Sequence, residues 1–301
     1  MEFRELTERY DLEKILRSGR TSTVMRAADR QSGQTVAVKM IQAVLLVPPD
    51  GFPEAARRFQ AYAAALAVLH HPCLPETLDA GITPDGSAFL VTEMVEGRGL
   101  DTLAGKLPPP EALALLEPML DALEALASRG MAHGNLSPDN VLLLDGGQVK
   151  LLGLGSAVFR TGKSPAPAES ARFMAPEVAQ GAVPSARSDL YSYGRTVCHL
   201  LGASVAPGDS PSVQLPFPVT LEVANDAPLR EILEKLLRKD PAERPVFLEV
   251  RTAFAKALGT AAPTATPAVA IPEPEPVAEQ PIPEGNVFLD ITDELLDSLQ
   301  G

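Results

Sequence analysis

Strand and helix signals are unevenly divided along this chain of 301 residues. Up to residue 92 the two alternate: residues 35–41 are β-branched and apolar, as in a central strand, and residues 54–69 repeat apolar side chains at helical spacing. Residues 89–92 predict a further short strand. Helices are then predicted over residues 111–129, 188–201, 229–239 and 247–258. This order favours an α+β fold in which strands gather in the first part of the chain.

Composition bounds the class of protein and its partners. A hydrophobic content of 45% supports a real core. The net charge is −13, and the eight acidic residues after Thr260, with no Lys or Arg among them, leave −5 for the body (31 acidic minus 26 basic). An acidic body argues against nucleic acid or an anionic membrane as the main partner.

Cysteine usage and the apolar runs predict a cytoplasmic protein. Cys73 and Cys198 are isolated, without the spacing of a metal or redox site. We find no signal peptide at the N-terminus and no apolar run long enough to span a bilayer.

The composition changes at Gly259. Residues 259–285 contain seven prolines and predict an extended linker. Residues 286–301 are acidic, yet Ile291, Leu295 and Leu299 recur every four residues, as in a short helix that docks into a groove. A disordered, solubilising terminus explains the same composition, and both interpretations stay open.

A series of short motifs in fixed order is the most specific signal. The motifs are Thr23-Val24, Val36-Ala37-Val38-Lys39, His71-Pro72, Leu90-Val91-Thr92-Glu93, His133 to Asn140, Gly153-Leu154-Gly155, Ala175-Pro176-Glu177, Ser188 to Ser192 and Asp240 to Pro245. With them, residues 10–258 resemble a bacterial serine/threonine protein kinase domain. The resemblance implies a two-lobed fold, with a small β-rich lobe over residues 1–92 and a hinge with a mostly helical lobe over residues 93–258.

The same resemblance shows that the catalytic positions are degenerate. Asn135 stands where the family has the aspartate that accepts the substrate proton, and Gly153 stands where it has the magnesium-binding aspartate. Ser137 replaces the lysine that neutralises the transferred phosphoryl group. Tyr62 takes the place of the glutamate that orients the phosphate-binding lysine, unless the helix has another register and another acid serves. A neutral amide cannot act as the general base, so we expect no intact catalytic residue and no metal site.

Phosphate-binding groups are only partly kept. The three glycine positions of the phosphate loop fall on Arg17, Gly19 and Ser22, and the phosphate-binding lysine matches Lys39. A strand lysine that merely extends to solvent is the alternative for Lys39. Asn140, the second magnesium ligand, is retained. The adjacent Asp139 could recruit a cation, although a solvated loop carboxylate is the simpler interpretation.

The pocket for the adenine ring is better preserved. The nucleotide-binding set that the resemblance implies is Leu16, Gly19, Val24, Ala37, Lys39, Glu93, Val95, Asn140 and Leu142. Thr92 takes the gatekeeper place. We therefore expect no required cofactor and at most weak ATP binding with little dependence on magnesium. A pocket kept only as core packing remains the alternative.

Positions that touch only protein in the family are intact: His133, Glu177, Asp189 and Arg244. Glu177 and Arg244 match a buried ion pair, and Asp189 matches the acid that holds the catalytic loop. The sequence thus predicts a pseudokinase that binds signalling proteins through its kinase-like surface and residues 286–301. A serine/threonine kinase or another ATP-dependent transferase with residual or atypical activity is the alternative.

Overall fold

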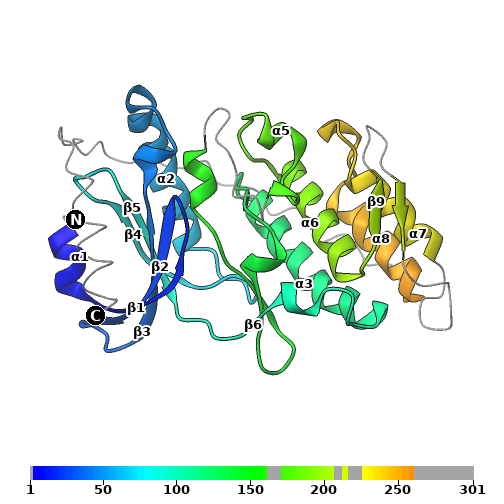
Figure 1. Cartoon of the computed structure of the whole chain (residues 1–301), viewed down its shortest axis with the longest axis horizontal. Helices are drawn as coiled ribbons and strands as arrows, with labels where there is room; N and C mark the ends of the chain where they lie inside the picture. The colour runs from blue at the N-terminus through cyan, green and yellow to red at the C-terminus, as the bar shows by residue number, and fades with distance from the viewer. Residues whose placement is uncertain (1–2, 161–170, 207–211, 216–225, 261–301) are drawn as a thin grey trace.

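The computed structural model describes residues 3–160, 171–206, 212–215 and 226–260. Its strands are β1 (Tyr10–Ser18), β2 (Ser22–Asp29), β3 (Thr35–Ile41), β4 (Thr77–Ile82), β5 (Ala88–Glu93), β6 (Arg98–Gly99), β7 (Val141–Leu143), β8 (Val149–Leu151), β9 (Ser204–Ala206) and β10 (Ser212–Gln214). Its α-helices are α1 (Phe3–Arg9), α2 (Phe52–Ala67), α3 (Pro109–Ala127), α5 (Pro176–Ala179), α6 (Ala186–Leu200), α7 (Asp226–Leu236) and α8 (Phe247–Leu258). The chain forms a sheet-containing lobe and a helical lobe along the long axis of the molecule (Figure 1). The predicted tail, residues 286–301, and nearly all of the predicted linker lie outside the described residues.

An antiparallel sheet of five strands builds the first lobe, in the order β1-β2-β3-β5-β4. β3 occupies residues 35–41, where the sequence predicted a central strand, and it is the third of the five. Val36 and Val38 are buried on one face of β3, while Ala37 and Lys39, which alternate with them, are partly exposed. This alternation turns Lys39 away from the small apolar cluster that Val36 and Val38 enter.

Helix α2 belongs to the sheet-containing lobe but packs against both lobes. Its apolar residues follow helical spacing, so one face is buried. Phe59 joins a small apolar cluster next to the sheet, whereas Tyr62 and Leu66 join the large core of the helical lobe. The position of α2 therefore determines how the two lobes meet.

Helices α3, α6, α7 and α8 form the helical lobe, with Leu116, Leu190, Tyr193 and Leu233 almost fully buried among them. Helix α6 begins at a capping box. The Ser185 hydroxyl accepts a hydrogen bond from the backbone N–H of Ser188, and the Ser188 hydroxyl accepts one from the backbone N–H of Ser185. The small sheet β6-β7-β8 lies at the start of this lobe. Its strands β7 and β8 place residues 132–140 and 152–155 side by side.

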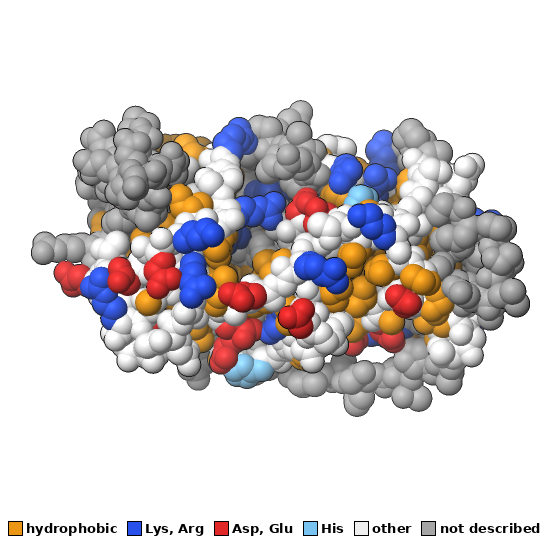
Figure 2. All heavy atoms as spheres, turned by 60° about the horizontal axis from the view of Figure 1, so that its bottom comes forward, with side chains coloured by type: hydrophobic (Ala, Val, Ile, Leu, Met, Phe, Trp, Pro, Cys, Tyr) orange, Lys and Arg blue, Asp and Glu red, His pale blue; other side chains and the backbone are white. Residues whose placement is uncertain are grey.

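Basic, acidic and apolar side chains are interspersed on the face shown in Figure 2. This mixed surface agrees with the modest charge of the folded body. No helix among the described residues has the length and apolar character to cross a membrane.

Candidate functional site

A buried carboxylate holds the loop of residues 133–140, which matches the family's catalytic loop. Asp189, on α6, accepts hydrogen bonds from the backbone N–H groups of His133 (2.7 Å) and Gly134 (2.8 Å). Burial raises the pKa of Asp189 to about 7, and these two N–H groups act against that shift. His133 is fully buried and its Nε2 lies 3.0 Å from the Leu152 carbonyl oxygen, so the loop is also joined to the segment that contains Gly153.

Three polar side chains lie where the family has its catalytic and metal-binding groups. We call this region the cleft: it is where Arg17 of β1 and Lys39 of β3 contact residues 139–140 and 153–154. The Asn140 amide Nδ2 donates to the Asn135 carbonyl oxygen (2.8 Å) and lies 3.4 Å from the Ser137 hydroxyl. Ser137 and Asn140 are buried, and Asn135 is partly exposed. The loop is thus ordered around neutral groups, none of which can accept a proton from a hydroxyl at neutral pH.

Gly153 lacks a carboxylate, and its backbone also has a conformation that favours glycine. Its φ is +92°, in the region that favours glycine, and a Cβ there would lie 3.0 Å from Asn140 Cγ and 3.2 Å from Asn135 Nδ2. The amides of Asn135 and Asn140 therefore crowd the position from which an aspartate side chain would start.

Arg17 reaches across the cleft to the one retained metal-ligand position. It lies next to a register shift of β1 between Ile15 and Arg17, an irregularity that redirects side chains. Its Nη1 donates to Asn140 Oδ1 (2.9 Å) and to the Asp139 carbonyl oxygen (3.2 Å). The oxygen that would ligate magnesium is thus already an acceptor for a cation of the protein. The sequence located Arg17 only as a lost glycine and did not predict this contact.

Lys39 is held by carbonyl oxygens instead of a carboxylate. Its Nζ donates to the carbonyl oxygens of Gly153 (3.0 Å) and Leu154 (2.7 Å). Burial first, and then the nearby positive charges of Arg160 and Arg17, lower the pKa of Lys39 to about 7. Lys39 therefore lies inside the cleft and not along the surface, which was the alternative considered from the sequence.

Tyr62 links α2 to both loops of the cleft. It is buried, and its hydroxyl donates a hydrogen bond to the Ala132 carbonyl oxygen at 3.2 Å. The same hydroxyl accepts a hydrogen bond from the backbone N–H of Gly155. Burial raises the pKa of the phenol far above its usual value, so it stays neutral. The residue at the glutamate position is thus a structural tie and not a partner for Lys39.

Arg160 is a second cation that the sequence did not indicate. It follows Phe159, which is fully buried and packs on Phe59 of α2 with ring centroids 5.0 Å apart. Its Nη2 lies 3.4 Å from Asn135 Oδ1, and its Nη1 is buried without a hydrogen-bond partner among the described residues. The cost of burying the charge lowers the pKa of Arg160.

The apolar residues predicted to enclose an adenine ring are not fully buried. Leu16 is 42% exposed, and Val24, Ala37, Leu142 and Val95 are partly exposed. Gly19 is exposed and its N–H donates to the Ser22 carbonyl oxygen (2.9 Å) in the β1–β2 turn.

Glu93, in the hinge, pairs with Lys150, whose Nζ also donates to the Leu74 carbonyl oxygen (3.0 Å). The sequence analysis did not find that pair. It ties the hinge to β8 and to the loop that follows α2.

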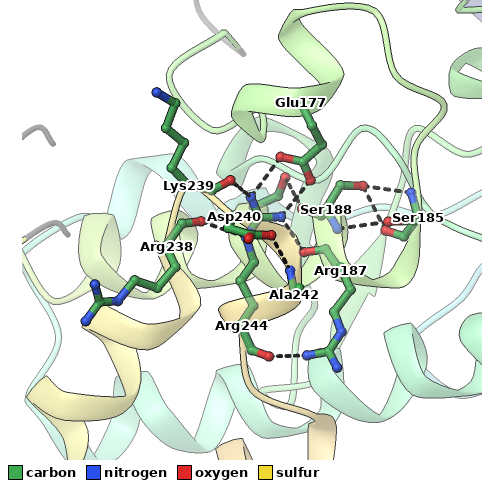
Figure 3. A network of polar contacts seen from close by, with 10 residues as sticks. Glu177, Ser185, Arg187, Ser188, Arg238, Lys239, Asp240, Ala242 and Arg244 are labelled. Carbon is green, nitrogen blue, oxygen red and sulfur yellow. Dashed lines mark hydrogen bonds and ion pairs between the residues drawn. The ribbon is translucent and has the colours of Figure 1, made fainter. Parts of the chain in front are cut away.

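An ion pair joins α5 to the chain before α8 in the helical lobe (Figure 3). Arg244 is completely buried, and its Nη1 and Nη2 lie 2.6 Å and 2.8 Å from the two carboxylate oxygens of Glu177. The remaining guanidinium donors go to the carbonyl oxygens of Arg187, Arg238 and Lys239. Every donor is used, so the buried charge is fully compensated.

The residues present do not fit the magnesium ions that the fold would imply. Magnesium is bound in such sites through carboxylates, and the described part of the chain has no group of His, Cys, Asp and Glu arranged to hold a metal. Asn140 alone remains, and its side-chain oxygen accepts from Arg17.

Comparison with known proteins gives a consistent family. Residues 10–253 match the family model described as Protein kinase domain. The chain is similar to serine/threonine-protein kinase PknA of Mycobacterium tuberculosis, with 30% identity over 264 residues that cover 79% of this chain and 58% of PknA. It is also similar to serine/threonine-protein kinase PknB of Mycolicibacterium smegmatis, with 31% identity over 260 residues, 79% of this chain and 41% of PknB.

Among solved structures, the crystal structure of the M. tuberculosis PknI kinase domain matches with a TM-score of 0.62 and 24% identity, over 84% of this chain and 96% of that chain. This likeness confirms the two-lobed fold that the sequence predicts. The chain spans between 32% and 58% of the length of the curated relatives it matches.

Proposed function

This chain belongs to the protein kinase domain family, and we propose that it is a pseudokinase that acts by binding other signalling proteins. The observation that carries the proposal is the surroundings of Asn140. Its side-chain oxygen accepts a hydrogen bond from Arg17, and the neighbouring Asn135 and Gly153 supply no carboxylate. Phosphoryl transfer depends on metal ions and on a base that positions the hydroxyl. Among the described residues, no side chain beside Asn140 meets either requirement.

The expected loss is large. A missing general base alone lowers a rate by about 10²–10⁴, and a kinase turns over at about 1–100 s⁻¹ to begin with. Loss of the metal carboxylate acts on the same transition state, so the effects do not simply add. Little useful turnover remains. The groups that hold the fold, including Arg244, Glu177 and Asp189, are meanwhile fully engaged.

We place partner binding on the kinase-like surface and on residues 286–301. The tail has apolar residues at helical spacing among acids, a composition that suits a groove with basic edges.

The test of the proposal is an activity assay of the purified chain. With Mg-ATP and generic protein substrates we expect no phosphate incorporation above that of the Lys39→Ala variant. Incorporation that depends on Lys39 would overturn the proposal, because Lys39 is the phosphate-binding group that the family's chemistry requires.

One observation favours a second function, an ATP-dependent transferase. Lys39 is retained inside the cleft, and the relatives are named serine/threonine-protein kinases. Mass spectrometry of the chain after incubation with ATP separates the two functions, because phosphate transfer, nucleotide transfer and no reaction give different mass changes.

A further inference from the structure

The pairing of β1 with β2 places Arg17 on the face of the sheet that is turned toward the helical lobe. Residues that pair across neighbouring strands lie on the same face. Arg17 pairs with Val24, which pairs with Lys39 on β3, and Lys39 in turn pairs with Leu90 on β5. Leu90 joins the large core of the helical lobe, and Lys39 donates to two carbonyl oxygens of that lobe. The row that begins at Arg17 therefore faces the cleft.

This placement of Arg17 depends on the irregularity in β1. The partners of Ile15 and Arg17 are consecutive residues of β2, so Leu16 is an extra residue in the register of the two strands. With regular pairing, Leu16 would lie opposite Val24, and Arg17 would lie on the other face of the sheet. The extra residue is what brings the guanidinium group to the cleft.

The guanidinium group of Arg17 joins the end of the β1–β2 hairpin to the helical lobe. Its Nη1 donates to Asn140 Oδ1 (2.9 Å) and to the Asp139 carbonyl oxygen (3.2 Å). Asn140 is only 7% exposed, and its Nδ2 donates to the Asn135 carbonyl oxygen, so the acceptor is itself held in place. Hydrogen bonds from a charged donor are stronger than those between neutral groups. The two lobes are thus linked by a charge-assisted contact at the cleft.

The end of the hairpin has little buried surface of its own. Residues 16–20 are all exposed, and none of them belongs to the three apolar clusters of the described chain. A segment with few buried contacts opens locally at a low cost in free energy. The contact of Arg17 can therefore decide whether this end of the hairpin lies on the helical lobe or apart from it.

We propose that Arg17 is a latch: its hydrogen bonds to residues 139 and 140 hold the β1–β2 hairpin on the helical lobe and keep the cleft closed in the resting chain. The closure is made by side chains of the protein itself. Tyr62, which joins α2 to the Ala132 carbonyl oxygen, is a second contact between the lobes. Together the two contacts fix the lobes relative to each other, so the surface that spans both lobes has one arrangement.

Hydrogen–deuterium exchange of the purified full chain tests the latch. We expect the backbone amides of residues 17–24 to exchange about 10-fold faster in Arg17→Gln than in the native chain, because glutamine removes the charged donor. Arg17 is exposed, so the substitution leaves the core intact. Lys14→Gln is the matched control: Lys14 is an exposed cation of the same strand that precedes the irregularity, and its loss should leave the exchange unchanged. Equal exchange in Arg17→Gln and the native chain, or an equal acceleration by Lys14→Gln, would overturn the proposal.

Spin labels on the substitutions Gly19→Cys and Gln180→Cys measure the closure as a distance. Gly19 lies in the β1–β2 turn, where a Cβ makes one ordinary contact of 3.5 Å with a carbonyl oxygen, and Gln180 is exposed at the end of α5 in the helical lobe. Cys73 and Cys198 are buried, so we expect them to stay unlabelled. One narrow distance distribution is expected with Arg17 in place, and a broader distribution with a longer mean distance in Arg17→Gln. Distributions of equal width and mean in the two backgrounds would show that Arg17 does not hold the cleft closed.

The latch and the proposed function fail separately. Phosphate incorporation that depends on Lys39 would remove the noncatalytic function and leave the latch as it is. Unchanged exchange in Arg17→Gln would remove the latch, while the carboxylates missing at Asn135 and Gly153 would still argue against phosphoryl transfer.

Discussion

His133 shows how one buried side chain can make stability depend on pH. Burial, followed by the nearby charge of Lys39, lowers the pKa of His133 to about 4, against an ordinary value of 6.5. Between these values the unfolded chain takes up a proton that the folded chain does not. The contribution of His133 to stability is therefore complete above pH 6.5 and is lost as the pH falls to about 4.

We predict that this contribution amounts to roughly 3 kcal/mol over that window. The measurement is the free energy of unfolding in urea at several pH values for the native chain and for His133→Gln. The variant should be less stable at pH 7, and its stability should fall less steeply below pH 6.5. His70→Gln, at an exposed position, is the control and should follow the native chain. Equal slopes for the native chain and His133→Gln would contradict the prediction.

At this same scale, motif spacing predicted which positions match the family's site but not the contacts of their side chains. Motif order was enough to single out Lys39, Asn140, Tyr62 and Gly153, since intervals between motifs are fixed by the elements that carry them. The contact of Arg17 with Asn140 depends on an irregularity in the pairing of β1 with β2 and spans 123 positions of sequence. No local pattern encodes such a contact, so it could be found only in the folded chain.

At the scale of elements, Arg244 joins α5, α6 and the chain before α8. Its guanidinium has no exposed surface and bonds Glu177 and three carbonyl oxygens. Removing one partner of a buried, satisfied pair leaves the other partner uncompensated. We predict that Arg244→Met lowers the free energy of unfolding by about 3–5 kcal/mol.

Chemical denaturation checks that value, with Lys235→Met as the control. Lys235 pairs with Glu231 on the exposed surface of α7, where a salt bridge contributes about 0–1 kcal/mol. A loss below 1 kcal/mol for Arg244→Met would mean that the helical lobe does not depend on this pair.

Element positions followed closely from periodicity. β3 and α8 have the predicted bounds, and α2, α3, α6 and α7 begin two to three residues before the prediction. Proline explains two of these earlier starts, because it is well tolerated in the first turn of a helix, where the backbone N–H that it lacks would have no partner within the helix. Pro53 lies in the first turn of α2, and Pro109 is the first residue of α3.

At the scale of the whole molecule, restoring the two missing carboxylates should not restore a kinase. We predict that Asn135→Asp combined with Gly153→Asp yields no phosphate incorporation above the native chain in a radiolabelled ATP assay. The Cβ of an aspartate at position 153 would lie 3.0 Å from Asn140 Cγ, and the backbone φ of +92° there favours glycine. Arg17 would still donate a hydrogen bond to the Asn140 side-chain oxygen. Tyr62 leaves Lys39 without its usual carboxylate partner.

A kinase domain with both carboxylates serves as the positive control for that assay. Clear incorporation by the double variant would show that the two carboxylates alone were missing. The Gly134 position adds a further obstacle to a complete reversion, because a Cβ there would lie 2.8 Å from the Pro184 Cβ at a φ of +65°.

The environment of Lys39 also has a consequence for reactivity. With a pKa of about 7, its side chain is present at neutral pH as a mixture of ammonium and free amine. A free amine is a nucleophile, and this one is held in place by the carbonyl oxygens of Gly153 and Leu154. Acyl phosphates and aldehydes that reach Lys39 would therefore meet a nucleophilic amine at neutral pH.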